Sequence, residues 1–197
     1  MFFHRSGGGI SWLLVGLGNP GNQYAATRHN MGFMALDRLA DREGFRFNKL
    51  RFRAWTGQWK VGDQQVLVMK PQTYMNLSGE SVGEAARFYK IPADHVLVIS
   101  DDVSLPAGKL RIGGRRQRRR AQRPEEYHPA PGHRQVPPAS RWGVGSPGPE
   151  STTWWTGSWA KPMGEDRTAA EDALDRAGEA AKTLITEGID RAMNRFN

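Results

Sequence analysis

Histidine and aspartate are the side chains in this 197-residue sequence whose placement could support proton transfer. His29 lies at the start of an expected helix, and Asp101 follows an apolar stretch expected to be a strand. A carboxylate that accepts a hydrogen bond from one imidazole nitrogen leaves the other nitrogen able to act as a general base. Each residue also has an ordinary interpretation, because a lone histidine often packs or lies at the surface and the Asp101-Asp102 pair could form a turn or a cap.

A glycine-rich loop follows the first apolar run, Trp12–Gly16, and contains Asn19 in the sequence Gly-Leu-Gly-Asn-Pro-Gly. The spacing matches the dinucleotide-binding pattern G-x-G-x-x-G. However, Pro20 removes one backbone N–H donor, and no acidic residue ends the next expected strand in the α/β unit, Val66–Lys70. The loop therefore favours a substrate-binding role at the carboxyl end of a strand, with a plain structural turn as the alternative.

Asn76 lies between an expected strand and an expected helix. An amide at such a place can cap the helix or hold a substrate amide, and the chemistry leaves both open. Ser78 could complete a Ser-His-Asp set, but no G-x-S-x-G turn surrounds it, so capping of the helix from Ser78 or Ser81 is its expected role.

The residue types also exclude several kinds of site. The chain has no cysteine, which rules out disulfides, thiolate nucleophiles and cysteine-ligated zinc. Histidine and acidic residues do not fall at metal-ligand spacings, so we expect neither a metal nor another cofactor. No apolar run reaches the roughly 20 residues of a membrane span, and the start of the chain does not resemble a signal peptide, so we expect a soluble, cytoplasmic protein.

Short apolar runs alternate with amphipathic segments, which predicts an α/β domain. Residues 1–11 are expected to form a disordered extension and residues 12–197 a single catalytic domain. The expected helices lie at 29–42, 78–89 and 169–185, with a last turn after Gly188, and the expected strands at 12–16, 52–60, 66–70, 96–100 and from 109.

The positive charge is unevenly distributed along the chain. The net charge is +8, but residues 113–163 hold nine of the 28 Lys and Arg and three of the 20 Asp and Glu, leaving only +2 for the other residues. This segment contains no Leu, Ile or Phe, so we expect it to be poorly ordered. Its six arginines between 115 and 123, together with its tryptophans, could instead bind RNA.

Several longer motifs resemble the bacterial-type peptidyl-tRNA hydrolase family. They are Trp12–Gly21 with Tyr24, Thr27–Gly32, Lys70–Gly79, Ile99–Asp102 with Leu105-Pro106, and Ala192–Phe196. The resemblance covers about 12–112 and 164–197. It implies a single α/β domain with a mixed twisted sheet flanked by helices, and hydrolysis of the ester that joins a peptide to the terminal ribose of tRNA.

The resemblance also implies residue roles. His29 would be the general base that activates water, and Asp101 would orient it. Asn19 and Asn76 would hold the peptidyl part and the scissile region. The remaining implied residues are Tyr24 and Met75, which would line the cleft, and Lys109 and Arg111, which would face tRNA phosphates. The family suggests a monomer whose partner is peptidyl-tRNA, with no metal and no membrane.

Residues 113–163 depart from this family. The family carries Gly-Gly-His-Asn-Gly after the strand that begins near Lys109, whereas this chain has an arginine-rich run from Gly114 to Glu125. We interpret 113–163 as an out-of-frame reading, and expect reduced activity from a chain that lacks the family's asparagine there. The alternative function is that of a non-catalytic RNA-binding protein that uses 113–163.

Overall fold

The computed structural model describes residues 9–21, 30–74, 77–102, 105, 108–113, 140–145 and 165–197. Its elements in chain order are β1 (Trp12–Gly16), α1 (Met31–Glu43), β2 (Lys49–Arg51), β3 (Ala54–Val61), β4 (Gln64–Pro71), α2 (Ser78–Tyr89), a 3-10 turn (Ala93–His95), β5 (Val96–Asp102), β6 (Leu110–Gly113), β7 (Ser140–Gly145), α3 (Glu165–Glu187) and α4 (Ile189–Phe196).

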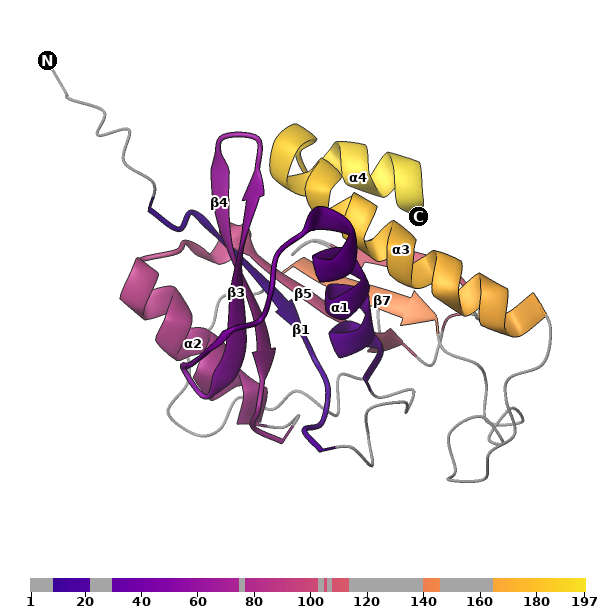
Figure 1. Ribbon diagram of the computed structural model, residues 1–197. Helices are drawn as coiled ribbons and strands as arrows, with labels where there is room; N and C mark the ends of the chain where they lie inside the picture. Colours follow the sequence, from indigo (N-terminus) through magenta and orange to yellow (C-terminus); the bar gives the residue numbers. More distant parts are fainter. Residues whose placement is uncertain are drawn as a thin grey trace, which may run out of the picture.

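These strands form one mixed sheet in the order β2-β3-β4-β1-β5-β7-β6 (Figure 1). β1 is parallel to β4 and β5, and β5 is parallel to β7. The pairs β2–β3, β3–β4 and β6–β7 are antiparallel. The expected α/β architecture with a mixed sheet is therefore confirmed, and strand β2 is an addition that its three exposed residues did not signal.

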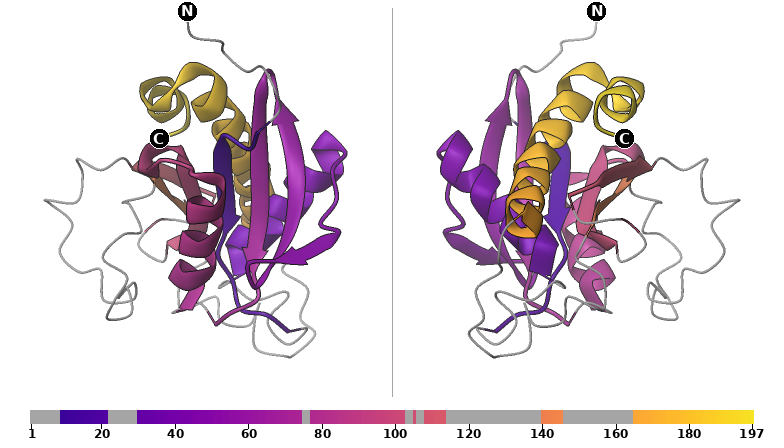
Figure 2. Two further views of the ribbon diagram at one scale, coloured as in Figure 1. Left: turned by 90° about the vertical axis from the view of Figure 1, so that its left-hand side faces the viewer. Right: turned by 90° about the vertical axis from the view of Figure 1, so that its right-hand side faces the viewer.

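The sheet separates two apolar clusters. One lies under α1, α3 and α4 and includes Leu14, Leu36 and Leu174. The other lies under α2 and includes Leu13, Val82 and other buried residues of β1, β3 and β4. Successive strand residues point to opposite faces, which is why Leu13 and Leu14 belong to different clusters. Figure 2 shows the helices on either side of the sheet.

Strand β7 comes from the segment that the composition predicted to be poorly ordered. Residues 140–145 pair with β5 along the whole strand and with four residues of β6. A strand bonded on both sides is held by its backbone N–H and C=O groups, which requires no large aliphatic side chains. The segment therefore contributes 140–145 to the sheet, 114–139 and 146–164 lie outside the described residues, and the expected poor order of 113–163 stays a prediction.

The serine caps predicted for α2 are not found. Leu77 occupies the N-cap position without a side-chain hydrogen bond, and Ser78 is the first helical residue. Among the described residues, the buried hydroxyl of Ser78 has no hydrogen-bond partner. Ser81 instead donates its hydroxyl to the carbonyl oxygen of Phe52 at 2.6 Å, because it faces the turn between β2 and β3. The prediction of a capping role was therefore wrong for both serines.

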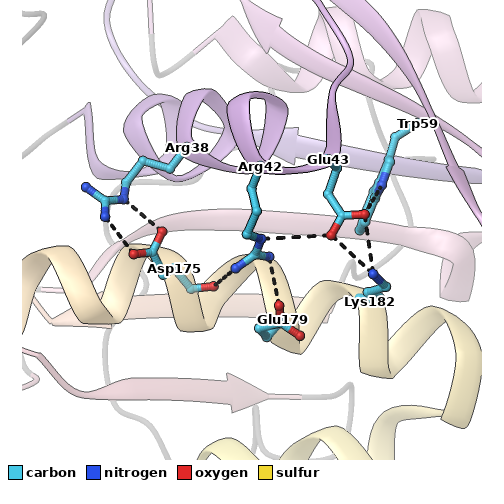
Figure 3. Close-up of polar contacts among 7 residues, drawn as sticks. All are labelled: Arg38, Arg42, Glu43, Trp59, Asp175, Glu179 and Lys182. Carbon is cyan, nitrogen blue, oxygen red and sulfur yellow. Dashed lines mark hydrogen bonds and ion pairs between the residues drawn. The ribbon is translucent and has the colours of Figure 1, made fainter.

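Polar contacts join α1 to α3 along their length (Figure 3). Arg38 donates two hydrogen bonds to the carboxylate of Asp175, at 2.8 and 2.6 Å. These bonds hold the pKa of Asp175 below its ordinary value. Arg42 also forms an ion pair with Glu179 at 3.1 Å.

The end of α1 contributes a second set of contacts to the same seam. Glu43 accepts hydrogen bonds from the indole of Trp59 at 3.2 Å and from the ammonium of Lys182 at 3.2 and 3.3 Å. Together with the pairs at Arg38 and Arg42, these bonds fix α1 against a helix that lies more than 120 residues later in the chain.

Candidate functional site at the carboxyl edge of the sheet

The carboxyl ends of β1, β4 and β5 meet at one edge of the sheet because these three strands are parallel. The loop with Asn19 follows β1, and the segment with Asn76 follows β4. Asp101 is the penultimate residue of β5. The topology therefore brings to one edge three chain segments that are far apart in the sequence.

Four of the predicted site residues lie outside the described part of the chain. These residues are Tyr24, His29, Met75 and Asn76. The structure does describe Asn30, which directly follows His29 and precedes the first residue of α1. Asn30 therefore locates the start of α1, which begins two residues after His29 in the sequence.

Two glycines allow α1 to approach the sheet at this edge. A Cβ atom on Gly16 would lie 2.3 Å from the carbonyl oxygen of Gly32, and a Cβ on Gly32 would lie 2.5 Å from the carbonyl oxygen of Ile99. The backbone N–H of Leu17 donates to that same oxygen of Ile99 at 2.8 Å. The first turn of α1 thus rests directly on the ends of β1 and β5.

Asn30 is a residue that the sequence reasoning did not single out. Its side chain is 2% exposed, and it bonds the backbone of Asn19 twice. The N–H of Asn19 donates to Oδ1 of Asn30 at 2.6 Å, and Nδ2 of Asn30 donates to the carbonyl oxygen of Asn19 at 3.1 Å. The only signal in the sequence was its position next to His29, which by itself suggests a helix cap.

Asp101 falls on the α1 side of the sheet. Leu97 and Ile99 belong to the cluster under α1, and Asp101 continues the same alternation two residues further along β5. Its side chain is half-buried. A carboxylate placed there lies on the face of the sheet from which the chain enters α1.

The two basic residues predicted to face tRNA lie together at the start of β6. Lys109 and Arg111 are exposed. Leu110 and Ile112 are buried in the apolar cluster under α1, α3 and α4. Residues two apart on a strand share a face, so both cations point away from α3 and α4. In the strand register Asp101 pairs with Val144 and Val144 pairs with Leu110, which places the cations two strands from Asp101.

Within the described residues, no group of three His, Asp or Glu side chains is arranged to hold a metal ion. The described helices also include none with the length and apolar character needed to cross a membrane.

Comparison with known proteins shows which family the chain resembles in sequence. The family model for peptidyl-tRNA hydrolase matches residues 13–197, and so continues through 113–163. A peptidyl-tRNA hydrolase of Alkaliphilus metalliredigens is 38% identical over 189 residues, covering 94% of this chain and 99% of that protein. A chloroplastic group IIB intron splicing facilitator of Zea mays is 40% identical over 189 residues, covering 94% of this chain and 72% of that protein.

A solved structure shows the same arrangement of elements. Peptidyl-tRNA hydrolase from Acinetobacter baumannii superposes with a TM-score of 0.70 at 29% identity, covering 95% of this chain and 96% of that one. A family match over nearly the whole chain, a curated relative covered almost end to end and a shared fold agree. The chain therefore belongs to the peptidyl-tRNA hydrolase family.

Proposed function

We propose that this protein hydrolyses the ester bond between the peptide and the tRNA in peptidyl-tRNA, which releases tRNA for reuse. The observation that supports it is the joining of three segments at one edge of the sheet. Asn30, the residue that follows His29, bonds the backbone of Asn19, and the close contact between Gly16 and Gly32 sets the first turn of α1 against the ends of β1 and β5. This joining supports a site in which a base from the segment before α1, the carboxylate of Asp101 and the Asn19 loop act together.

In the proposed reaction His29 removes a proton from water as the water attacks the ester carbonyl, and Asp101 orients the imidazole. The proton then passes to the departing ribose oxygen, so that a free peptide carboxylate and a tRNA hydroxyl result. Asn19 and Asn76 hold the peptidyl part and the scissile region by hydrogen bonds. An ester needs only an oriented water, a base and amide donors, so the mechanism uses no metal and no other cofactor.

The flanking residues extend the site toward both parts of the substrate. Tyr24 and Met75 line the cleft beside the two asparagines, and Lys109 and Arg111 neutralise tRNA phosphates. We place the enzyme in the cytoplasm as a monomer, with 12–197 as one catalytic domain. Its rate falls below that of relatives that carry Gly-Gly-His-Asn-Gly, because one amide donor is missing from the site.

The test is the deacylation of an N-acetylated aminoacyl-tRNA by the purified chain, with and without EDTA. We expect turnover that survives EDTA, that His29→Ala abolishes, and that Asp101→Asn lowers by about two orders of magnitude in kcat. His95→Gln is the matched control, because His95 stacks on Trp12 at 4.0 Å beside the amino end of β1 and so lies away from the proposed site. Turnover that persists in His29→Ala would refute the base assignment.

A second candidate function is RNA binding without catalysis. The observation that favours it is the 40% identical relative that is named as a splicing facilitator. Proteins with this degree of similarity to the chain therefore include one that is not named as a hydrolase. Under this alternative the wild-type chain binds tRNA but does not deacylate the substrate, and removal of the arginines between 115 and 123 weakens binding.

A further inference from the structure

A cluster of aromatic rings lies on the surface where the β2–β3 turn meets α2. Phe88 is 59% exposed. The ring centroid of Phe52 lies 5.4 Å from that of Phe88 and 5.9 Å from that of Tyr89, and the last two lie 4.8 Å apart. We call Lys49, Arg51, Phe52, Arg53, Arg87, Phe88, Tyr89 and Lys90 the turn–α2 surface.

An arginine is held in place over these rings. The guanidinium of Arg51 lies 4.9 Å from the ring centroid of Phe52 and 5.0 Å from that of Phe88. It also donates a hydrogen bond to the hydroxyl of Tyr89 at 3.2 Å. Because the guanidinium is already stacked and bonded, it loses little conformational freedom when a planar or anionic ligand binds.

The turn that presents Phe52 is itself fixed. Phe52 and Arg53 both have φ near 53°, a left-handed conformation that residues with side chains adopt only when their surroundings impose it. Ser81 bonds the carbonyl oxygen of Phe52 at 2.6 Å, and Arg53 reaches Glu80 at 2.6 Å. The aromatic ring therefore occupies a defined position at the edge of α2.

The charge on this surface is strongly positive. Five basic residues belong to this surface, of which Arg51 lies over the rings, and the two neighbouring acids, Glu80 and Glu84, both pair with Arg53. Lys49, Arg87 and Lys90 are exposed and make no ion pair with a described acidic residue. The net charge of the surface is thus +3, larger than the +2 carried by all the residues outside 113–163.

We propose that the turn–α2 surface binds unpaired RNA, with bases stacked on Phe88 and phosphates held by the surrounding cations. Exposed rings flanked by unpaired basic groups are the combination that single strands require, since every base has a face to stack and every linkage a negative charge. A second copy of the chain fits poorly, because two such surfaces would bring like charges together. Lys49 and Arg51 are also the first and last residues of the short edge strand β2, and their charges discourage pairing of two copies through it.

The surface adjoins the carboxyl edge of the sheet. The backbone N–H of Gln72 donates to the carbonyl oxygen of Arg53 at 2.8 Å, so the turn touches the segment that leads from β4 toward Asn76. Lys109 and Arg111 lie at the other end of the strand order, directly before β6 and within it. The turn–α2 surface is therefore an RNA contact separate from the one proposed at β6, and it does not depend on hydrolysis.

The experiment measures binding of a fluorescein-labelled 12-nucleotide oligouridylate by anisotropy, in 50 to 200 mM KCl. Each substitution is made both in the wild-type chain and in a variant whose six arginines between 115 and 123 are replaced by glutamine. The second series removes RNA binding by those arginines. We expect Phe88→Ala to weaken binding about tenfold in both. We expect Arg87→Gln and Lys90→Gln each to weaken it a few-fold and to reduce the salt slope by about 0.7 per lost phosphate contact.

The matched controls change the same residue types elsewhere. Trp55→Ala removes a ring that is 42% exposed and lies on the opposite face of the sheet, and Lys60→Gln removes an exposed cation near the far end of β3. We expect both to bind as the wild type does. Phe88→Tyr keeps a ring and should retain affinity.

The proposal would be overturned if Phe88→Ala, Arg87→Gln and Lys90→Gln bound oligouridylate with the same affinity as the controls. Loss of affinity in the charge variants with none in Phe88→Ala would also overturn it, since stacking would then play no part. Binding of an acidic protein at this surface, with no binding of oligouridylate by the wild type, would overturn the proposal and assign the surface to a protein partner instead. Failure of the deacylation assay affects none of these outcomes and would refute only the proposed enzyme.

Discussion

The side-chain amide of Asn30 closes a two-bond ring with the backbone of Asn19. One bond is donated by the Asn19 N–H at 2.6 Å and the other by Asn30 Nδ2 at 3.1 Å. The amide thus acts like a short stretch of neighbouring strand and fixes the loop after β1 to the start of α1. We expect a change in this pair to loosen the Asn19 loop from the start of α1, whose N-cap residue Asn30 directly follows His29 in the sequence.

Asn30→Asp tests that relationship with almost no change of shape. A carboxylate keeps the acceptor for the Asn19 N–H but repels the Asn19 carbonyl oxygen, and a buried unmatched pair costs about 1–3 kcal/mol. We expect lower stability in urea unfolding and at least a tenfold loss of kcat in deacylation.

The loss should depend on pH. Burial raises the pKa of a carboxyl group at this site, so the folded state binds the proton more tightly than the unfolded state. The destabilisation is therefore greatest at pH 8 and smaller near pH 5, where a protonated carboxyl can donate as the amide does. Asn48→Asp, at an exposed asparagine, is the control. A pH-independent destabilisation would show that the second hydrogen bond does not matter.

Gly32→Ala should disrupt the contact between α1 and the sheet. The added Cβ would lie 2.5 Å from three backbone atoms, Ile99 O, Leu17 N and Leu17 O, none of which can rotate away. We expect a loss of about 3 kcal/mol or more in the free energy of unfolding, measured by denaturant titration.

The control for that substitution lies within α3. A Cβ on Gly178 would meet the ends of the Arg42 and Leu39 side chains at 2.9 and 3.0 Å, and these can move. Alanine also favours a helix interior over glycine by up to about 1 kcal/mol. Gly178→Ala should therefore change stability little, and a loss as large as that of Gly32→Ala would contradict the packing argument.

The Arg38–Asp175 pair should contribute a small, pH-dependent coupling. Arg38 lowers the pKa of Asp175 in the folded state, so the stabilisation is present above the ordinary carboxyl range near pH 4 and is lost as the pH falls through the lowered value. Both side chains are about 40% exposed, which limits the coupling to roughly 0.5–1 kcal/mol. A double-mutant cycle with Arg38→Ala and Asp175→Ala at pH 7 and pH 2 measures it, and a coupling unchanged at pH 2 would disprove the assignment.

Lys109 and Arg111 should affect substrate binding rather than turnover. Replacing either with glutamine removes one phosphate contact, so we expect KM for peptidyl-tRNA to rise about three- to tenfold while kcat stays unchanged. The salt dependence of kcat/KM should become shallower by roughly one power of the salt concentration for each lost contact. Lys60→Gln is again the control, and a fall in kcat without a change in KM would place these cations in another role.

The sequence alone determined the class of fold, the family and the identity of the chemical groups. Apolar runs and amphipathic segments located β1, α1, β3, β4, α2, β5 and α3 within a few residues, because periodicity is a local property. The long motifs around Asn19, His29 and Asp101 identified the family, which the comparisons confirm. The assignment of roles to those residues stays a prediction.

Only the tertiary structure decided how distant segments meet. Strand β7 could not be predicted from a segment without Leu, Ile or Phe, because its place depends on backbone pairing with β5 and β6. Ser78 and Ser81 had the spacing of helix caps, but packing against the β2–β3 turn gave Ser81 another partner. Asn30 likewise bonds the loop that holds Asn19, eleven residues earlier in the chain. Local propensity could not predict these contacts, because each partner is supplied by the folding of another segment of the chain.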